Sequence, residues 1–565
     1  MPLTPHWIRH YPRQHLRDDL IAGVLLTVLV IPQSLAYALL AGLPPQAGLY
    51  ASILPAIAYA WFGSSMVQAV GPVAITAIMT ASVLGPLAPV GSALYLQLAV
   101  WLSLGSGVLI TLCGLARLGF LSQLLSKPVV SGFITGSALL IILSQLRFIG
   151  GIDARGNTSW QLLHSLWAWL PDIHVPTLLL GVGAVVALAL ARTGLKRWPM
   201  WQRLFPLLLI LVCPWVVQGL ALDPGQRIAV VGPVSLEWAS FDFSMPHPSV
   251  FSALVGPTFL IAFIGMVQGI TMAQALATQR RERIDANQEL LGLGAANIAA
   301  TFSGGMPVGG GLSRSAINVA SGAQTPLAGI VSGISMLAVL LLGTDWLNHV
   351  PLAILAANII IAAWGMIDLT ALRQAWAYDR ADAIAWLGTA SGVLALGLET
   401  GIAVGIGLSL ATLLWRTSSP HIAVIGRLPG TQSFRNVNRY ATETLPRTLM
   451  LRIDESLFFG NLQAVEERLG LELAQAPDTQ DVVWVMTAVN RVDTSAMAAL
   501  LNLNRDLKDR GIRMHFAEVK GPVQDRLVHT PLWTELSGEF FHSVPDAFAA
   551  LQASRQEPHD AALSI

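Results

Sequence analysis

The chain has 565 residues, of which 33 are basic and 33 acidic, so its zero net charge gives no general attraction to nucleic acid or acidic partners. Hydrophobic residues make up 54% and charged residues only 12%, and the mean hydropathy is +0.60. Soluble globular proteins carry about 25% charged residues. The composition therefore excludes an ordinary soluble protein and indicates a polytopic membrane protein.

The N-terminal region has scattered charges that end at Asp18 and Asp19, and no small-residue cleavage pattern follows them. We expect residues 1–19 to form a retained cytoplasmic arm. From Leu20 to Ala116 the chain contains no Asp, Glu, Lys or Arg. That length accommodates several spans of about 20 residues each.

Apolar runs broken by Gly, Pro or charge predict fourteen membrane segments within a transmembrane transport domain at 20–416. The first seven lie near 20–41, 47–63, 70–88, 93–116, 128–148, 176–192 and 204–221. The second seven lie near 250–276, 287–302, 312–322, 325–343, 350–366, 382–397 and 400–416. An even number of spans places both termini on the same side of the membrane.

The basic residues of the loops indicate on which side of the membrane both termini lie. Even-numbered loops contain most of the basic residues, such as Lys196 and Arg197, whereas the odd-numbered loops have only Arg147, Arg155 and Arg227. Lys and Arg accumulate in cytoplasmic loops. We therefore expect a multi-pass protein with both termini in the cytoplasm.

The third and tenth segments are interrupted. The third follows the break VGPVAITA at 70–77 and the tenth follows the Gly-rich stretch SGGMPVGGGLSRS at 303–315. Interrupted segments at matching places in two halves indicate a transporter's binding site, where half-helix N-termini meet. Their free N–H groups and positive dipole ends favour an anion. The alternative is that Gly and Pro merely permit close helix packing.

Arg314 opens the tenth segment and is the single Asp, Glu, Lys or Arg between Glu289 and Asp345. A lone charge at membrane depth indicates a functional site. Its planar guanidinium, flanked by Ser313 and Ser315, suits an oxyanion. Alternatively, it bonds backbone carbonyls freed by the glycines or extends to water.

The chain becomes polar and turn-rich after Arg416, which predicts a linker at 417–446. Apolar runs at 448–453, 481–489 and 513–519 then alternate with helical stretches at 464–476 and 495–510. This alternation predicts a small α/β domain over 447–553, followed by a tail at 554–565.

Four motifs together resemble the sulfate permease (SulP) family, which includes solute carrier family 26: GLPPQAGLYAS (42–52), VGPVAITA, NQELLGLGAANI (287–298) and LSRSAINVASGAQTPLAGI (312–330). The resemblance implies a polytopic α-helical fold of seven plus seven inverted segments, divided into core and gate domains. It places an anion site between the third and tenth segments. Carried over position by position, the implied substrate-binding residues are Gln33, Tyr37, Val73, Ala74, Leu312, Ser313 and Arg314, to which the reasoning above adds Ser315. Tyr37 and Val73 are equally compatible with ordinary packing.

The eighth segment departs from the family pattern. Many relatives have a Glu motif where this chain has Gln268. Because Gln cannot take up a proton, carboxylate-based coupling is less favoured than anion exchange or flux down an anion gradient. The Thr271 hydroxyl remains a possible ion ligand, and Gln268 is alternatively a helix-to-helix hydrogen bond.

The C-terminal α/β domain resembles the STAS module found in this family and in bacterial anti-sigma-factor antagonists. VDTSA (492–496) occupies the place of a loop whose serine can be phosphorylated, so Ser495 is the matching regulatory phosphosite. Ala496 replaces the expected glycine, however, and DTSA is also a good helix N-cap, the interpretation we favour.

No motif indicates an enzyme or a cofactor. Cys113 and Cys213 lack metal-ligand spacing, and VGGGLSRS lacks the Lys of a phosphate-binding loop, which argues against ATP-driven transport.

We therefore expect secondary transport of a small oxyanion by core-versus-gate alternating access in a plasma membrane, such as a bacterial inner membrane. Sulfate is the first choice because the resembling family is named for it. The alternatives are bicarbonate, chloride or dicarboxylate exchange, channel-like conduction, and an anion-responsive sensor acting through the STAS domain. The resemblance also suggests a homodimer and a cytoplasmic regulator.

Overall fold

The computed structural model describes residues 5–9, 11–123, 126–154, 156, 158–219, 228–232, 244–342 and 348–561. Within these ranges the side chains of a few residues, including Leu312 and Ser313, are not described. The chain divides into two compact units, Met1–Leu410 and Ala411–Ile565.

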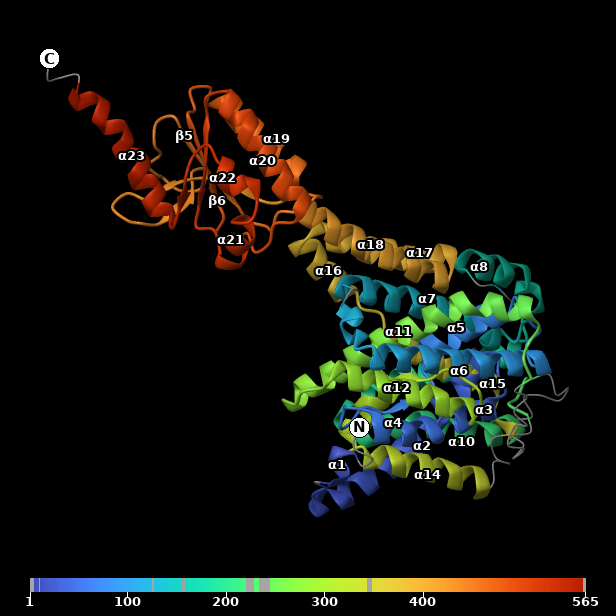
Figure 1. The fold of residues 1–565 in the computed structure, drawn as a ribbon. Coiled ribbons are helices and arrows are strands. Elements are labelled where there is room, and N and C mark those ends of the chain that lie inside the picture. Colours follow the sequence, from blue (N-terminus) through green and yellow to red (C-terminus); the bar gives the residue numbers. More distant parts are fainter. Residues whose placement is uncertain are drawn as a thin grey trace. The chain divides into compact units, whose positions relative to one another are not determined.

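Each of the fourteen predicted membrane segments corresponds to a helical element of the structure, and Figure 1 labels most of these elements. Those of the first half are α2 (Leu16–Leu40), α3 (Pro45–Tyr50) with α4 (Leu54–Phe62), β1 (Val70–Gly71) with α5 (Ala74–Leu84), α6 (Ala93–Leu115), α7 (Lys127–Gly150), α9 (Val175–Gly194) and α10 (Pro199–Gly219). Those of the second half are α11 (Pro248–Arg280), α12 (Ala286–Thr301), β2 (Gly309–Gly310) with α13 (Leu312–Ala320), α14 (Leu327–Leu342), α15 (Leu352–Trp364), α17 (Arg380–Leu396) and α18 (Leu398–Ser418). The fold class predicted from the sequence is confirmed.

Shorter elements connect these segments. They are α1 (His6–Arg9), η1 (Arg13–His15), η2 (Leu118–Gln123), α8 (Ser159–Ala168), η3 (Leu170–Asp172), η4 (Leu195–Arg197) and α16 (Leu369–Tyr378). Seven helical stretches among the described residues are long and apolar enough to cross a membrane. In contrast, α5 has 11 residues and α13 has 9. At about 1.5 Å per residue, neither crosses an apolar layer of about 30 Å.

The helices form two packed groups. In one, α12 packs against α6 and α4, α14 packs against α2, and α11 packs against α6. In the other, α7 packs against α17 and α15, and α15 packs against α9. Helix α2 also packs against α15 and α10, so it joins the two groups. This arrangement corresponds to the expected core and gate domains.

The expected N-terminal arm ends earlier than predicted. Helix α2 begins at Leu16, and Asp19 in its first turn is fully buried. The Asp19 carboxylate accepts hydrogen bonds from the backbone N–H groups of Gln324 and Thr325 and from the hydroxyls of Thr325 and Tyr11. Because four donors compensate its burial, this charge belongs to the packed domain and not to a solvated arm.

The second unit contains a six-stranded sheet in the order β4-β3-β5-β6-β7-β8. Its strands are β3 (Ile422–Arg427), β4 (Phe434–Asn436), β5 (Thr448–Ile453), β6 (Asp481–Val485), β7 (Arg513–Ala517) and β8 (Phe540–Phe541). Strands β5 to β8 are parallel, whereas β3 pairs antiparallel with β4 and β5. The helices are α19 (Leu462–Gln475), α20 (Thr494–Asp509), α21 (Gly521–Leu527), α22 (Pro531–Glu535) and α23 (Val544–Ala561).

Two expected boundaries of this domain need correction. The segment 417–446 is not a simple linker, because β3 and β4 lie within it and extend the sheet. The expected tail at 554–565 also starts inside the domain, since α23 continues to Ala561. Arg555 on that helix donates a hydrogen bond to the buried Asp481 carboxylate.

Candidate anion site

The interrupted third and tenth segments meet through a short antiparallel pairing of β1 with β2. Val70 pairs with Gly310, and Gly71 pairs with Gly309. This pairing brings together the N-terminal ends of α5 and α13, which follow the two strands directly. The sequence placed both breaks at the site, and the strand pairing explains how they come together.

Neither helix start is capped by a side chain. The N-cap residues, Val73 for α5 and Gly311 for α13, are extended and accept no hydrogen bond through a side chain from the first turn. By comparison, Ser92 caps α6 and Asp285 caps α12. Uncapped first-turn N–H groups and the positive dipole ends favour a bound anion.

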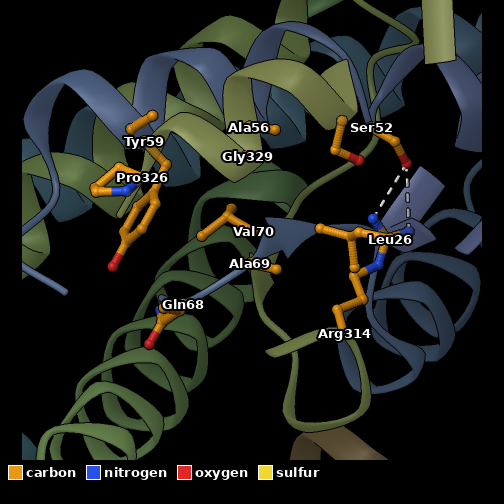
Figure 2. Close-up of a pocket in the computed structure, with 12 residues that line it drawn as sticks. Leu26, Ser52, Ala56, Tyr59, Gln68, Ala69, Val70, Arg314, Pro326 and Gly329 are labelled. Carbon is orange, nitrogen blue, oxygen red and sulfur yellow. Dashed lines mark hydrogen bonds between the residues drawn. The ribbon is translucent and has the colours of Figure 1, made fainter. Parts of the chain in front are cut away.

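Arg314 lies in the first turn of α13 and is 4% exposed. Its Nη2 donates to the Ser34 hydroxyl at 2.7 Å, and both Nη atoms lie 3.3 Å from the Ser52 hydroxyl, as Figure 2 shows for Ser52. Within the described residues, no carboxylate lies within ion-pair distance of the guanidinium. The site therefore keeps a net positive charge.

Glycine at position 71 permits the close approach of this guanidinium. A Cβ atom added there would lie 2.3 Å from Nη1 of Arg314. Because real atoms do not approach so closely, any side chain at position 71 would displace the guanidinium. The glycine of the break thus has a specific packing role.

The other predicted residues from the two breaks divide into three cases. Val73 and Ala74 are buried at the start of α5, and a Cβ atom added at Gly311 would lie 3.1 Å from Cγ1 of Val73. The Ser315 hydroxyl accepts a hydrogen bond from the Ala69 backbone N–H at 3.1 Å, so it connects α13 to the residue before β1. The side chains of Leu312 and Ser313 lie outside the described residues.

Helices α2 and α11 flank the two helix starts. Helix α2 packs against α5 and α13, and it contributes the half-buried Gln33 and the buried Tyr37. Helix α11 packs against α5 and β2. On α11 the Oε1 atom of Gln268 is buried without a hydrogen-bond partner among the described residues, whereas Thr271 is exposed.

Comparison with known proteins assigns the family. The Sulfate permease family model matches residues 16–389, and the STAS domain model matches residues 439–547. The chain belongs to the sulfate permease family. It is 34% identical over 558 residues to "Probable sulfate transporter 4.2" of Arabidopsis thaliana, covering 96% of this chain and 82% of that protein. It is also 34% identical over 556 residues to a probable sulfate transporter of Mycobacterium tuberculosis, covering 96% and 97% of the two chains.

A solved structure supports the fold of this permease over nearly its whole length. The overall structure of SLC26A9 superimposes with a TM-score of 0.87 at 21% sequence identity, covering 99% of this chain and 94% of that one. The family match confirms the resemblance inferred from the motifs, and this structure confirms the expected fold. The family and the named relatives are transporters and not enzymes.

Sequence reasoning missed the hydroxyls that hold Arg314. Ser34 and Ser52 are fully or almost fully buried and accept its hydrogen bonds, whereas Ser315, its neighbour in sequence, does not. A signal was available, because Ser34 follows Gln33 in IPQSLAY and Ser52 ends the GLPPQAGLYAS motif. Polar residues inside such apolar runs need partners.

A buried carboxylate of the permease core was also missed. Glu289 in the first turn of α12 is fully buried. It accepts hydrogen bonds from the Tyr59 hydroxyl at 2.5 Å and from the backbone N–H and hydroxyl of Ser64 at 3.1 and 2.7 Å. It therefore connects α12 to the end of α4 and the turn that follows.

In the STAS domain, the favoured interpretation of VDTSA is confirmed. Asp493 is the N-cap of α20, and its Oδ1 accepts a hydrogen bond from the Ala496 backbone N–H at 2.8 Å. Ser495 is exposed in the first turn of that helix. A cavity of about 560 Å³ lies beside this helix start, and Arg491, Thr494 and Arg526 are among its lining residues.

Proposed function

We propose that this permease carries a small oxyanion, with sulfate as the first candidate, by alternating movement of the core against the gate. The observation that carries this proposal is the guanidinium of Arg314, which is buried without a carboxylate partner among the described residues and lies in the first turn of an uncapped half-helix. The relatives named as sulfate transporters support the choice of substrate.

The anion lies between the starts of α5 and α13 in this proposal. The first-turn N–H groups of both helices donate to its oxygens, and Val73, Ala74, Leu312 and Ser313 line the site. The remaining residues around the anion are Gln33 and Tyr37 on α2 and Gln268 on α11. Arg314 contributes mainly its positive field, because its Nη atoms already donate to Ser34 and Ser52. A fixed positive charge in a low-dielectric site attracts an anion more strongly than it does in water.

The coupling mode follows from Gln268. An amide on α11 cannot carry a proton across, so we propose anion exchange or flux driven by the anion gradient. We also propose that the protein is a homodimer in a plasma membrane, with both termini in the cytoplasm. An exposed Ser495 beside a cavity lined by Arg491, Asp493 and Arg526 supports a cytoplasmic regulator of the STAS domain.

Uptake of labelled sulfate into proteoliposomes tests the function. We expect saturable uptake that Arg314→Ala reduces by about tenfold or more, because the variant loses the positive field of the buried guanidinium and a tenfold change corresponds to about 1.4 kcal/mol. Arg283→Ala, at an exposed position before α12, is the matched control. Full uptake by the Arg314→Ala variant would refute this site.

Competition between labelled sulfate and unlabelled anions identifies the preferred substrate, and imposed ion gradients identify the coupling mode. Unlabelled bicarbonate, chloride and a dicarboxylate are added in turn, with and without an imposed proton or sodium gradient. Sulfate is expected to compete best, and the gradients are expected to change the rate little. Conductance that does not saturate would instead indicate a channel, and anion binding without uptake would indicate a sensor.

A further inference from the structure

Three consecutive glycines, Gly309 to Gly311, form β2 and the residue that follows it, directly before the start of α13 at Leu312. Arg314 lies in the first turn of that helix. Glycine has no side chain to pack against its neighbours, and it has the greatest backbone freedom of any residue. The position of the α13 start, and with it that of Arg314, therefore depends on groups outside the glycines that hold the backbone of this stretch.

The side chain of Asn297 on α12 holds the residue directly before the glycines. Its Oδ1 accepts a hydrogen bond from the Val308 backbone N–H at 2.9 Å, and its Nδ2 donates to the Val308 carbonyl oxygen at 2.9 Å. A residue of a neighbouring antiparallel strand forms the same pair of hydrogen bonds. The Asn297 amide thus takes the place of a further strand beside Val308.

The orientation of this amide is fixed by its partners. Nδ2 also donates to the carbonyl oxygen of Leu293, one turn earlier in α12, at 2.9 Å. If Oδ1 and Nδ2 exchanged places, Nδ2 would face the Val308 N–H and Oδ1 would face two carbonyl oxygens. Asn297 is 1% exposed, so leaving its amide unpaired would be costly. The amide is therefore committed to the backbone of Val308.

Helix α12 is a firm base for this contact, because glycines let it pack closely on its neighbours. A Cβ atom added at Gly107 of α6 would lie 2.7 Å from the backbone N of Ile298, and one added at Gly292 would lie 2.5 Å from Cα of Gly63, which ends α4. Small residues permit such close approach between membrane helices. A side chain that is supported on a rigid element holds its partner most precisely.

A second contact holds the same stretch from the other half-helix. The Thr76 hydroxyl in the first turn of α5 donates to the Pro307 carbonyl oxygen at 3.1 Å, in addition to the Val73 carbonyl oxygen of its own helix. Pro307 and Val308 are thereby connected to α5 and α12, respectively. Both contacts precede the glycines, so they set where β2 begins.

We propose that Asn297 is a positioning residue for the anion site, which holds β2 and thereby places the start of α13 and Arg314 opposite the start of α5. Thr76 supports the same position from α5. Asn297 does not touch the anion in this scheme, and its effect on transport passes through Val308 and the glycines. The inference rests on the proposed function for its kinetic consequence, but its structural consequence can be measured without transport.

Hydrogen exchange of the full-length protein tests the structural consequence. In Asn297→Leu, which keeps a similar side-chain volume, the peptide that covers 303–315 should exchange about tenfold faster or more, whereas a peptide from α7 should keep its wild-type rate. The matched control is Thr301→Val, because the Thr301 hydroxyl is equally buried and donates to the Asn297 carbonyl within α12. Unchanged exchange at 303–315, or an equal increase in both peptides, would overturn the proposal.

Uptake of labelled sulfate tests the kinetic consequence. Asn297→Leu should raise KM about fivefold to tenfold and leave kcat within about twofold of wild type, whereas Thr301→Val should change neither. An unchanged KM in folded Asn297→Leu would overturn the positioning role. A wild-type protein that takes up no sulfate would instead refute the proposed function, and the exchange result would still decide the role of Asn297.

Thr76→Val provides a milder, isosteric variant that decides the question if Asn297→Leu yields no folded protein. It removes the hydroxyl that holds Pro307 and should raise KM about threefold with little change in kcat. Its matched control is Thr80→Val, since Thr80 is fully buried one turn later and donates to the Thr76 carbonyl within α5. Equal KM values for these two variants would show that the hold on β2 does not place the anion site.

Discussion

Arg314 Nη2 donates a hydrogen bond to the Ser34 hydroxyl at 2.7 Å, across 280 residues of sequence. The contact joins α13 of the second half to α2 of the first half. It explains how a cation stays buried in an apolar domain without an acidic partner among the described residues. Hydroxyls satisfy its donors but do not neutralise its charge, so the positive field remains available to an anion.

Removing these hydroxyls should weaken anion binding. Ser34→Ala and Ser52→Ala each leave a guanidinium N–H unpaired, which costs about 1–2 kcal/mol and lets Arg314 shift. We expect KM for sulfate to rise about threefold to tenfold in each variant. Because both hydroxyls bond the same group, the double variant should deviate from the product of the single effects.

The matched control for the hydroxyl variants is Ser103→Ala, which removes a buried serine that donates to the Asn297 carbonyl on another pair of helices. Uptake kinetics in proteoliposomes provide the measurement. An unchanged KM in the Ser34→Ala and Ser52→Ala variants, with Ser103→Ala also unchanged, would show that the hydroxyls do not hold Arg314 in its functional position.

The paired glycines 71 and 309 should respond differently to alanine. In Gly71→Ala the new Cβ would lie 2.3 Å from Arg314 Nη1, whereas in Gly309→Ala the nearest side-chain atom is 3.4 Å away on Val73. We expect Gly71→Ala to reduce kcat/KM by about tenfold or more, as Arg314→Ala does. Gly309→Ala should reduce it much less. Equal effects of the two substitutions would argue that the strand pair, and not the guanidinium, is what alanine disturbs.

The Glu289 cluster should contribute to stability. Glu289→Ala leaves the Tyr59 hydroxyl and two donors of Ser64 without their acceptor, which predicts a loss of about 3 kcal/mol. Tyr59→Phe removes one hydrogen bond and should destabilise by about 1 kcal/mol. Thermal unfolding of the purified protein measures both changes as a lower Tm. A Tm for Glu289→Ala equal to that of wild type would contradict the cluster's role.

Low pH should lower the stability of the STAS domain because it protonates the Asp481 carboxylate. Burial alone would raise the pKa of this carboxyl, but hydrogen bonds from His515, Arg513 and Arg555 lower it from 3.8 to about 2. A lowered folded-state pKa adds stability that is complete above the unfolded pKa and is lost as pH falls through the folded one. The stabilisation should therefore disappear between about pH 4 and pH 2.

Hydrogen exchange of peptides from β6 and β7 in the full-length protein measures this effect. Asp481→Asn should lower protection at neutral pH by about 3 kcal/mol, because it removes one partner of a buried ionic cluster. It should also flatten the dependence on pH in the acid range. The exposed Asp509→Asn is the control, and identical acid profiles for Asp481→Asn and wild type would exclude this carboxyl as the cause.

The strongest sequence signals predicted the fold because they depend on local composition. The lengths of the apolar runs predicted the fourteen segments, and the Gly and Pro breaks indicated that the third and tenth are interrupted. Domain boundaries that depend on tertiary contacts could not be predicted as well from the sequence. The sequence predicts a cytoplasmic arm up to Asp19, because the four donors to this carboxylate lie on Tyr11 and on residues far along the chain. Strands β3 and β4 fall within the predicted linker because both are short and their surroundings are polar and turn-rich.

The sequence by itself determined that a lone arginine follows a glycine-rich break in a membrane protein of this family, since charge, apolar length and motifs are all properties of the linear chain. Only the tertiary structure decided which groups hold that arginine. Ser34, Ser52 and Gly71 lie more than 240 residues before it in the chain and reach it through the β1–β2 pairing and the packing of α2 against α13. Such contacts depend on distances between segments, which the order of residues along one segment does not contain.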